Sequence, residues 1–159
     1  MDKSTALWEI EQIKQLKARY MRLLDARNWP EFRELFADDF KFFREPGSVP
    51  VQGTVPKDTT ADAFCKRMAE IMSSSVISVH HGQMPEIEIV DPNTARGIWS
   101  LYDYVDLPER GYAMHGFGHY HEVYVKGTDG KWRIKESHLT RLRVDKVPTP
   151  VPPFSKKAS

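Results

Sequence analysis

The spacing of hydrophobic residues changes once along the chain. In the first seventy or so residues, apolar side chains recur every three or four positions, as on one face of an α-helix. This spacing predicts helices at about residues 4–27 and 31–36, and a third helix that Asp58 or Thr59 caps. Further along, apolar and polar residues alternate, which is typical of half-buried strands. Helices followed by a run of strands indicate an α+β protein.

Strands are predicted wherever this alternation runs between turn residues. In the first half, a short strand at 40–43 follows an Asp-Asp turn, and residues 44–58 form a long loop rich in Pro and Gly. The predicted strands of the second half are 76–81, 84–90, 94–106, 112–126 and 131–145. Such sequential strands indicate a mixed or antiparallel sheet, curved into a cone around the N-terminal helices. We expect this α+β barrel over residues 1–147 and a Pro-rich tail over 148–159.

The first predicted helix carries polar atoms on its hydrophobic face. Ile13, Leu16, Tyr20 and Leu23 share one side, so a phenol lies within the apolar stripe, and the carboxylate of Asp25 follows it. Tyr20 can be an ordinary core residue whose hydroxyl has a partner, and Asp25 a solvated acid at a helix end. Alternatively both face a polar pocket, and the later strands favour this second interpretation.

Polar residues within the strands also predict a pocket on the concave side of the sheet. Asp103 shares a strand face with Trp99, Leu101 and Val105, which is unexpected unless that face lines a cavity. We expect the same pocket to be lined by one face of the next strand. That face carries His115, Phe117, His119, His121 and Val123. In the adjacent pair His80 and His81, alternation directs one histidine inward and the other outward.

Composition narrows the function classes. The chain has 159 residues, 40% of them hydrophobic and 28% charged, which is ordinary for one globular domain. Its net charge of +1, without a basic run, gives no sign of nucleic-acid binding. Neither a signal segment nor an apolar run of membrane-spanning length is present. The single cysteine, Cys65, forms no internal disulfide, so we expect a reducing, cytoplasmic location.

Three kinds of chemistry can be compared. A metal could be held by His119 and His121 with Glu122 or His115, but no helical His-Glu motif or Cys cluster supports such a site. Nucleophilic catalysis is weaker still, because the chain has no Gly-x-Ser-x-Gly elbow. Acid–base catalysis fits best, since a histidine held by a carboxylate, with a tyrosine and an arginine nearby, needs no metal and no cofactor.

Several segments resemble the SnoaL-like branch of the nuclear transport factor 2-like superfamily, over about residues 7–145. The segments that carry the resemblance are 13–20, 24–25, 79–82, 85–87, 95–99 with Asp103, and 129–132. In detail they are similar to the bile acid 7α-dehydratases and, more distantly, to scytalone dehydratase. The loop at 44–58 and the strand around 110–121 depart from the bile acid enzymes, so the resemblance does not identify the substrate.

The resemblance implies catalytic roles for five residues. The matching positions are Tyr20, Asp25, His80, Asp103 and Arg141. His115 aligns, across a one-residue gap, with a second pocket histidine of scytalone dehydratase, whereas His119 and His121 have no counterpart in the bile acid enzymes. Together with Trp99 and Phe117, these three histidines are the residues that we expect to bind the substrate.

The expected function is that of a cofactor-independent lyase, a dehydratase, or an isomerase that acts on a cyclic small molecule with a carbonyl group. The alternative is a non-catalytic binding or structural subunit of the same fold, such as the small subunit of a ring-hydroxylating oxygenase. The faces opposite the pocket include Ile98, Tyr102, Tyr104, Tyr120 and Tyr124. So apolar an outer surface predicts a homodimer or homotrimer. The other expected partner is a small-molecule substrate, because the charge and the apolar runs indicate neither a nucleic-acid nor a membrane partner.

Overall fold

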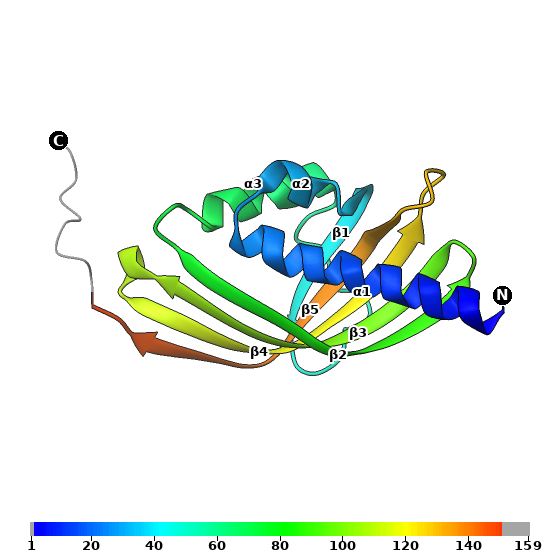
Figure 1. Cartoon of the computed structure of the whole chain (residues 1–159). Helices are drawn as coiled ribbons and strands as arrows, with labels where there is room; N and C mark the ends of the chain where they lie inside the picture. The colour runs from blue at the N-terminus through cyan, green and yellow to red at the C-terminus, as the bar shows by residue number, and fades with distance from the viewer. Residues whose placement is uncertain (1, 151–159) are drawn as a thin grey trace.

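A computed structural model of the chain describes residues 2–150. Three helices and five strands follow one another along the sequence (Figure 1). Their bounds are α1 Lys3–Asp25, α2 Trp29–Arg33, β1 Phe36–Pro46, α3 Ala61–Ile71, β2 Ile77–Asp91, β3 Thr94–Leu107, β4 Tyr112–Lys126 and β5 Trp132–Pro148. A 3₁₀ turn, Pro108–Arg110, connects β3 to β4. The protein is therefore α+β, with its helices in the first half, as the sequence predicts.

All five strands form one curved, mixed sheet in the order β1-β5-β4-β3-β2. β1 runs parallel to β5, and the other neighbouring strands are antiparallel. β1 and β2 form the two edges and do not pair with each other, so the predicted cone is not closed into a barrel. α1 lies across the concave side of the sheet, with α2 and α3 beside it (Figure 1).

The core lies between α1 and the sheet. The stripe of Ile13, Leu16, Tyr20 and Leu23 is buried, as its spacing predicts, and it packs against aromatic side chains of α2, β1 and α3. Side chains fix where the helices begin: Asp2 caps α1 and Asn28 caps α2. Thr60 caps α3 in place of the predicted Asp58 or Thr59, and Asp58 instead binds Arg67. Within residues 2–150, no helix combines the length and the hydrophobicity that crossing a membrane requires.

Several predicted boundaries are wrong. α2 spans Trp29–Arg33 rather than residues 31–36. β1 begins at Phe36 and includes Asp38 and Asp39, which were expected to form a turn, because Ile134 of β5 pairs with Phe36 and extends the strand. The segments 76–81 and 84–90 form one strand, β2, since a bulge between Gln83 and Glu86 bends the strand without ending it. Residues 151–159, most of the predicted tail, lie outside the described part of the chain.

The predicted faces of β4 are reversed. Tyr120 and Tyr124 are buried on the concave side, whereas Phe117 is exposed on the outer side. Alternation alone assigned the histidines to the inner face and Glu122 to the outer face. In the structure Glu122 lies on the inner face, because the ammonium of Lys17 on α1 neutralises it at 2.6 Å. The other inner positions include Gly118, where an added Cβ would lie 1.9 Å from the Thr140 carbonyl oxygen. Close packing with β5 therefore selects glycine at this position.

Candidate active site

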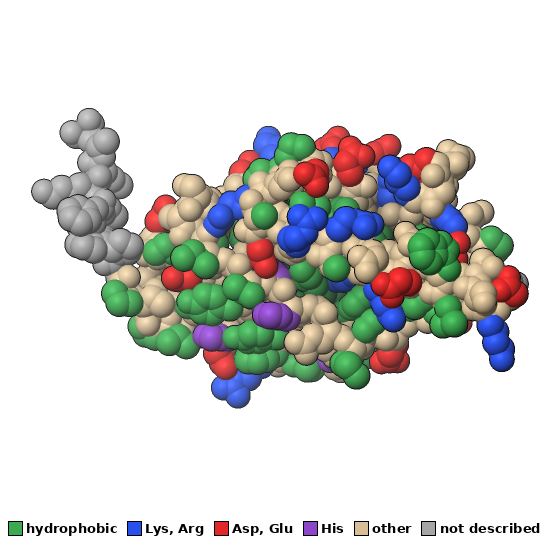
Figure 2. All heavy atoms as spheres, in the orientation of Figure 1, with side chains coloured by type: hydrophobic (Ala, Val, Ile, Leu, Met, Phe, Trp, Pro, Cys, Tyr) green, Lys and Arg blue, Asp and Glu red, His purple; other side chains and the backbone are tan. Residues whose placement is uncertain are grey.

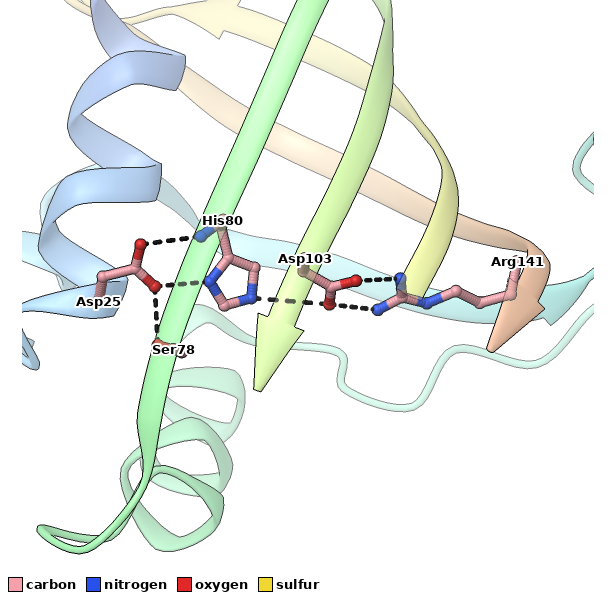
Figure 3. Close-up of polar contacts among 5 residues, drawn as sticks. All are labelled: Asp25, Ser78, His80, Asp103 and Arg141. Carbon is pink, nitrogen blue, oxygen red and sulfur yellow. Dashed lines mark hydrogen bonds and ion pairs between the residues drawn. The ribbon is translucent and has the colours of Figure 1, made fainter. Parts of the chain in front are cut away.

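A carboxylate and a histidine meet where α1 ends against β2. Asp25 is the last residue of α1, and its carboxylate accepts three hydrogen bonds from β2 (Figure 3). The donors are the hydroxyl of Ser78 at 2.7 Å, the backbone N–H of His80 at 2.9 Å and the imidazole Nδ1 of His80 at 2.6 Å. Because the Nδ1–H donates a hydrogen bond to Asp25, the other nitrogen of the neutral ring, Nε2, is left as the basic atom.

The charge of Asp25 follows from these contacts. Burial alone would raise the pKa of this carboxyl, but the hydrogen bonds from His80 and Ser78 outweigh it and hold the pKa below its ordinary value. Asp25 is therefore ionised at neutral pH and fixes the orientation of the imidazole. The side chain of His80 is only 8% exposed, so few other groups compete for its ring nitrogens.

An ion pair lies on the other side of His80. Asp103 is the cross-strand neighbour of His80, and its Oδ2 is 3.8 Å from His80 Nε2. Arg141 of β5 binds both oxygens of Asp103, at 2.5 and 2.7 Å. Burial would lower the pKa of Arg141, but the hydrogen bonds and charge of Asp103 raise it, so the guanidinium is charged. The four side chains form a row from α1 across the sheet to β5 (Figure 3).

A glycine on β4 makes room for this pair. β4 lies between β3 and β5, and its residue opposite Asp103 is Gly116. A Cβ added there would lie 2.1 Å from Asp103 Oδ1 and 2.2 Å from Arg141 Nη1, too close for either atom to stay in place. Sequence reasoning missed Gly116, although a glycine inside a strand is itself a sign of close approach.

Tyr20 completes the predicted set from the interior side. Its ring is 3% exposed and packs edge to face against Tyr120 and Phe36. Burial first, and then Tyr120 and Glu122, raise the pKa of its phenol well above the ordinary value of 10. The hydroxyl therefore remains protonated and can donate a hydrogen bond. Of the five residues that the resemblance implied, four form the row, and Tyr20 is buried beside it.

The predicted substrate-binding residues do not lie with this row. His115, Phe117, His119 and His121 belong to the outer face of β4, and their expected place on the pocket wall is wrong. His115 Nδ1 lies 2.9 Å from the hydroxyl of Tyr102, and His121 contacts the backbone oxygen of Ser48 at 3.3 Å. A hollow of about 440 Å³ beside His121 opens on this outer side, away from His80.

Trp99 faces the concave side, as predicted, but its polar atom is already bound. Its indole N–H donates to the hydroxyl of Tyr124 at 2.7 Å, and Tyr124 donates to Glu122 at 2.6 Å. Glu122 also pairs with Lys17, whose ammonium lies over the rings of Tyr20 and Tyr120. Sequence reasoning missed this buried network. The position of Lys17, four residues after Ile13 and three before Tyr20, was the available signal.

The geometry of the row supports acid–base chemistry. Within residues 2–150, no three His, Cys, Asp or Glu side chains are placed to share a metal ion. The row instead offers a nitrogen base, His80 Nε2, between two carboxylates. If this nitrogen takes a proton, Asp25 and Asp103 both stabilise the resulting imidazolium. Such an arrangement can remove a proton from a carbon atom and return it elsewhere.

Comparisons with known proteins agree with the fold. One similar solved structure is a candidate scytalone dehydratase from Novosphingobium aromaticivorans DSM 12444, with 20% identity, a TM-score of 0.74, and coverage of 94% of this chain and 97% of that one. Another is LinA type 2, a hexachlorocyclohexane dehydrochlorinase, with 17% identity, a TM-score of 0.73, and coverage of 96% and 99%.

A third similar structure is a Mycobacterium tuberculosis protein of unknown function, with 22% identity, a TM-score of 0.70, and coverage of 90% of this chain and 78% of that one. At these identities the likeness establishes the fold and not the activity. The similarity to bile acid 7α-dehydratases stays a prediction from the sequence. Residues 5–138, however, match the SnoaL-like domain, and the protein therefore belongs to the SnoaL-like family of nuclear transport factor 2-like folds.

Proposed function

We propose that the protein is a cofactor-independent acid–base enzyme, a dehydratase or an isomerase, that acts on a cyclic, carbonyl-containing small molecule in the cytoplasm. The observation that carries the proposal is the 2.6 Å contact between Asp25 and His80 Nδ1, which leaves Nε2 as a base. The names of two similar proteins, a candidate scytalone dehydratase and a dehydrochlorinase, fit elimination chemistry on a ring.

The specific reaction that we propose is dehydration of a β-hydroxy carbonyl compound. His80 Nε2 removes the proton next to the carbonyl, and the electron pair of the C–H bond moves toward the carbonyl oxygen, which becomes an oxyanion. The electrons then return to form the carbon–carbon double bond while the C–O bond to the β-hydroxyl breaks. The imidazolium gives its proton to the departing hydroxide, which leaves as water and restores the neutral base.

The remaining residues stabilise charge and orient the base. The protonated phenol of Tyr20 and the guanidinium of Arg141 are the donors proposed for the oxyanion. Asp25 holds the imidazole in the reactive tautomer, and Asp103 orients Arg141 or a hydroxyl of the substrate. An isomerase would use the same first step and return the proton to a different carbon atom.

The alternative function is a non-catalytic binding or structural subunit with this fold. A structural subunit can fill its concave side with apolar residues, and it gains nothing from a buried carboxylate, base and ion pair in contact. The row from Asp25 to Arg141 therefore favours the enzyme.

The first experiment is incubation with a panel of cyclic hydroxyketones, followed by mass spectrometry for the loss of one water. On a substrate found in this way, His80→Ala should lower turnover by about a hundredfold or more, the usual effect of removing a general base. His81→Ala is the matched control, because the neighbouring side chain points to the outer face and stacks near Tyr102. Equal turnover by His80→Ala and the unchanged protein would refute the assignment.

A further inference from the structure

The inner face of β1 ends in a cation near the candidate active site. Phe40 and Phe42 of β1 are buried in the core on the concave side, and Arg44 is the next residue of the same parity. The intervening Phe43 faces outward, where its ring stacks on His138 at a centroid distance of 3.9 Å. The Arg44 side chain therefore extends on the concave side, at its exposed rim.

Strand pairing places Arg44 beside the ion pair. Arg44 is the register partner of Leu139 on β5, and Leu139 and Arg141 have side chains on the concave side. The pKa of Arg44 reflects this proximity. Partial burial of the guanidinium lowers the pKa most, the charge of Arg141 lowers it further, and the charge of Asp103 raises it. Arg44 nevertheless stays charged at neutral pH.

Charge on this rim is not balanced. Arg141 is neutralised by Asp103, and the third nearby arginine, Arg67, is neutralised by Asp58, which it contacts at 2.5 Å. In the described part of the chain, no carboxylate lies within ion-pair distance of Arg44, and no side chain accepts a hydrogen bond from it. One positive charge beside the site is therefore left available for a ligand.

We propose that Arg44 binds a carboxylate of the substrate and so selects cyclic keto acids over neutral ketones. This rests on the proposed function, since it places the ring of the substrate between Arg44 and His80. A carboxylate matches the planar guanidinium with two parallel hydrogen bonds and cancels its single charge. A phosphate dianion would bring a second negative charge toward Asp103 and Asp58, so the charge count favours a carboxylate.

Binding can be tested without turnover. We would titrate the full chain with 4-oxocyclohexanecarboxylate, with its uncharged carboxamide and with inorganic phosphate, by calorimetry at low salt. The unchanged protein should bind the keto acid about tenfold more tightly than the amide, the scale of a charge-assisted contact. Arg44→Gln should remove this preference, and Arg44→Lys, which keeps the charge, should retain part of it.

The matched control is Lys41→Gln. This substitution also removes a positive charge from β1. Lys41 has the opposite parity to Arg44 and so lies on the other face of the sheet, and the preference for the keto acid should therefore survive. Circular dichroism and thermal unfolding would verify that each variant is folded. Among residues 2–150, Arg44 has no ion-pair partner whose loss would destabilise the fold.

Four results would overturn the proposal: equal binding of acid and amide, no binding of the acid below about 10 mM, an unchanged preference in Arg44→Gln, or tighter Arg44-dependent binding of phosphate. These outcomes are separate from those of the dehydration assay. An inactive panel with intact keto-acid binding would count against the proposed reaction alone, and activity that depends on His80 without acid preference would count against Arg44 alone.

Discussion

Replacing Gly116 by alanine should disrupt the candidate site by adding one methyl group. The backbone of Gly116 is not in the left-handed region, so alanine fits its local conformation and the effect isolates packing. The new Cβ would overlap Asp103 Oδ1 and Arg141 Nη1, both of which are about 2 Å from its ideal position. Asp103 has a short side chain on a paired strand, so it has little freedom to move away.

The magnitude follows from two known effects. Overpacking a filled site costs about 1–3 kcal/mol, and separating a buried ion pair costs about 3–5 kcal/mol when one charge is left without its partner. The Asp103 side chain is 3% exposed and that of Arg141 is 9%, but Arg141 is flexible enough to recover part of the contact. We therefore expect the free energy of unfolding to fall by about 2–4 kcal/mol.

Urea denaturation of Gly116→Ala against the unchanged protein measures this loss. A double-mutant cycle supplies the control: in a chain that already carries Asp103→Ala and Arg141→Ala, the glycine substitution should cost less than about 1 kcal/mol. Turnover on an identified substrate should fall with the loss of the ion pair. A destabilisation within about 0.5 kcal/mol of zero in the otherwise unchanged chain would refute the steric argument.

Three further predictions concern Asp25, Cys65 and the outer face. Because the folded-state pKa of Asp25 is depressed, its contacts stabilise the fold above the ordinary value of 3.8 and are lost as pH falls through the folded value. Between about pH 5 and pH 2, urea midpoints should thus fall less steeply for Asp25→Asn, and equal slopes would contradict this. Burial raises the pKa of the Cys65 thiol to about 11, so a thiol reagent at about pH 8 should label the native protein slowly and the unfolded chain rapidly; similar rates would show an accessible thiol. Apolar side chains cover part of the surface in view (Figure 2), and Ile77, Val79 and Phe117 are among the exposed ones. We propose that further copies of the chain cover such residues; light scattering should report a dimer or trimer, and a mass near 18.4 kDa would argue against it.

Local patterns were sufficient for the elements and for part of the site. The spacing of Ile13, Leu16 and Tyr20 identified the buried face of α1, and alternation placed Asp103 on the concave side because its neighbours on that face are large and apolar. Tyr20 and Asp25 could be assigned to the concave side for the same reason, since a helix has only one side that faces the sheet.

The faces of β4 could not be predicted, because both were mixtures of aromatic and polar residues. What decides them is contact between distant parts of the chain: Lys17 neutralises Glu122 across 105 residues of sequence. Without that partner a buried glutamate is costly, so reasoning from the strand alone put Glu122 outside. Arg44 was missed for a related reason, because the strand that carries it was predicted to end one residue earlier.

The row from Asp25 to Arg141 runs across the strands, so the distances between its side chains depend on the curvature of the sheet. His80 belongs to the edge strand β2, Asp103 to β3 and Arg141 to β5, and Gly116 of β4 lies beneath the pair. We expect a change in the curvature of the sheet to alter the 3.8 Å separation between His80 Nε2 and Asp103 Oδ2, even when every residue of the site is unchanged. The register shift of β5 against β4 at Phe117 and Gly118 helps to set that bend. We therefore expect outer-face substitutions that alter the curvature of the sheet to change the reactivity of His80, although they lie on the opposite side from the site.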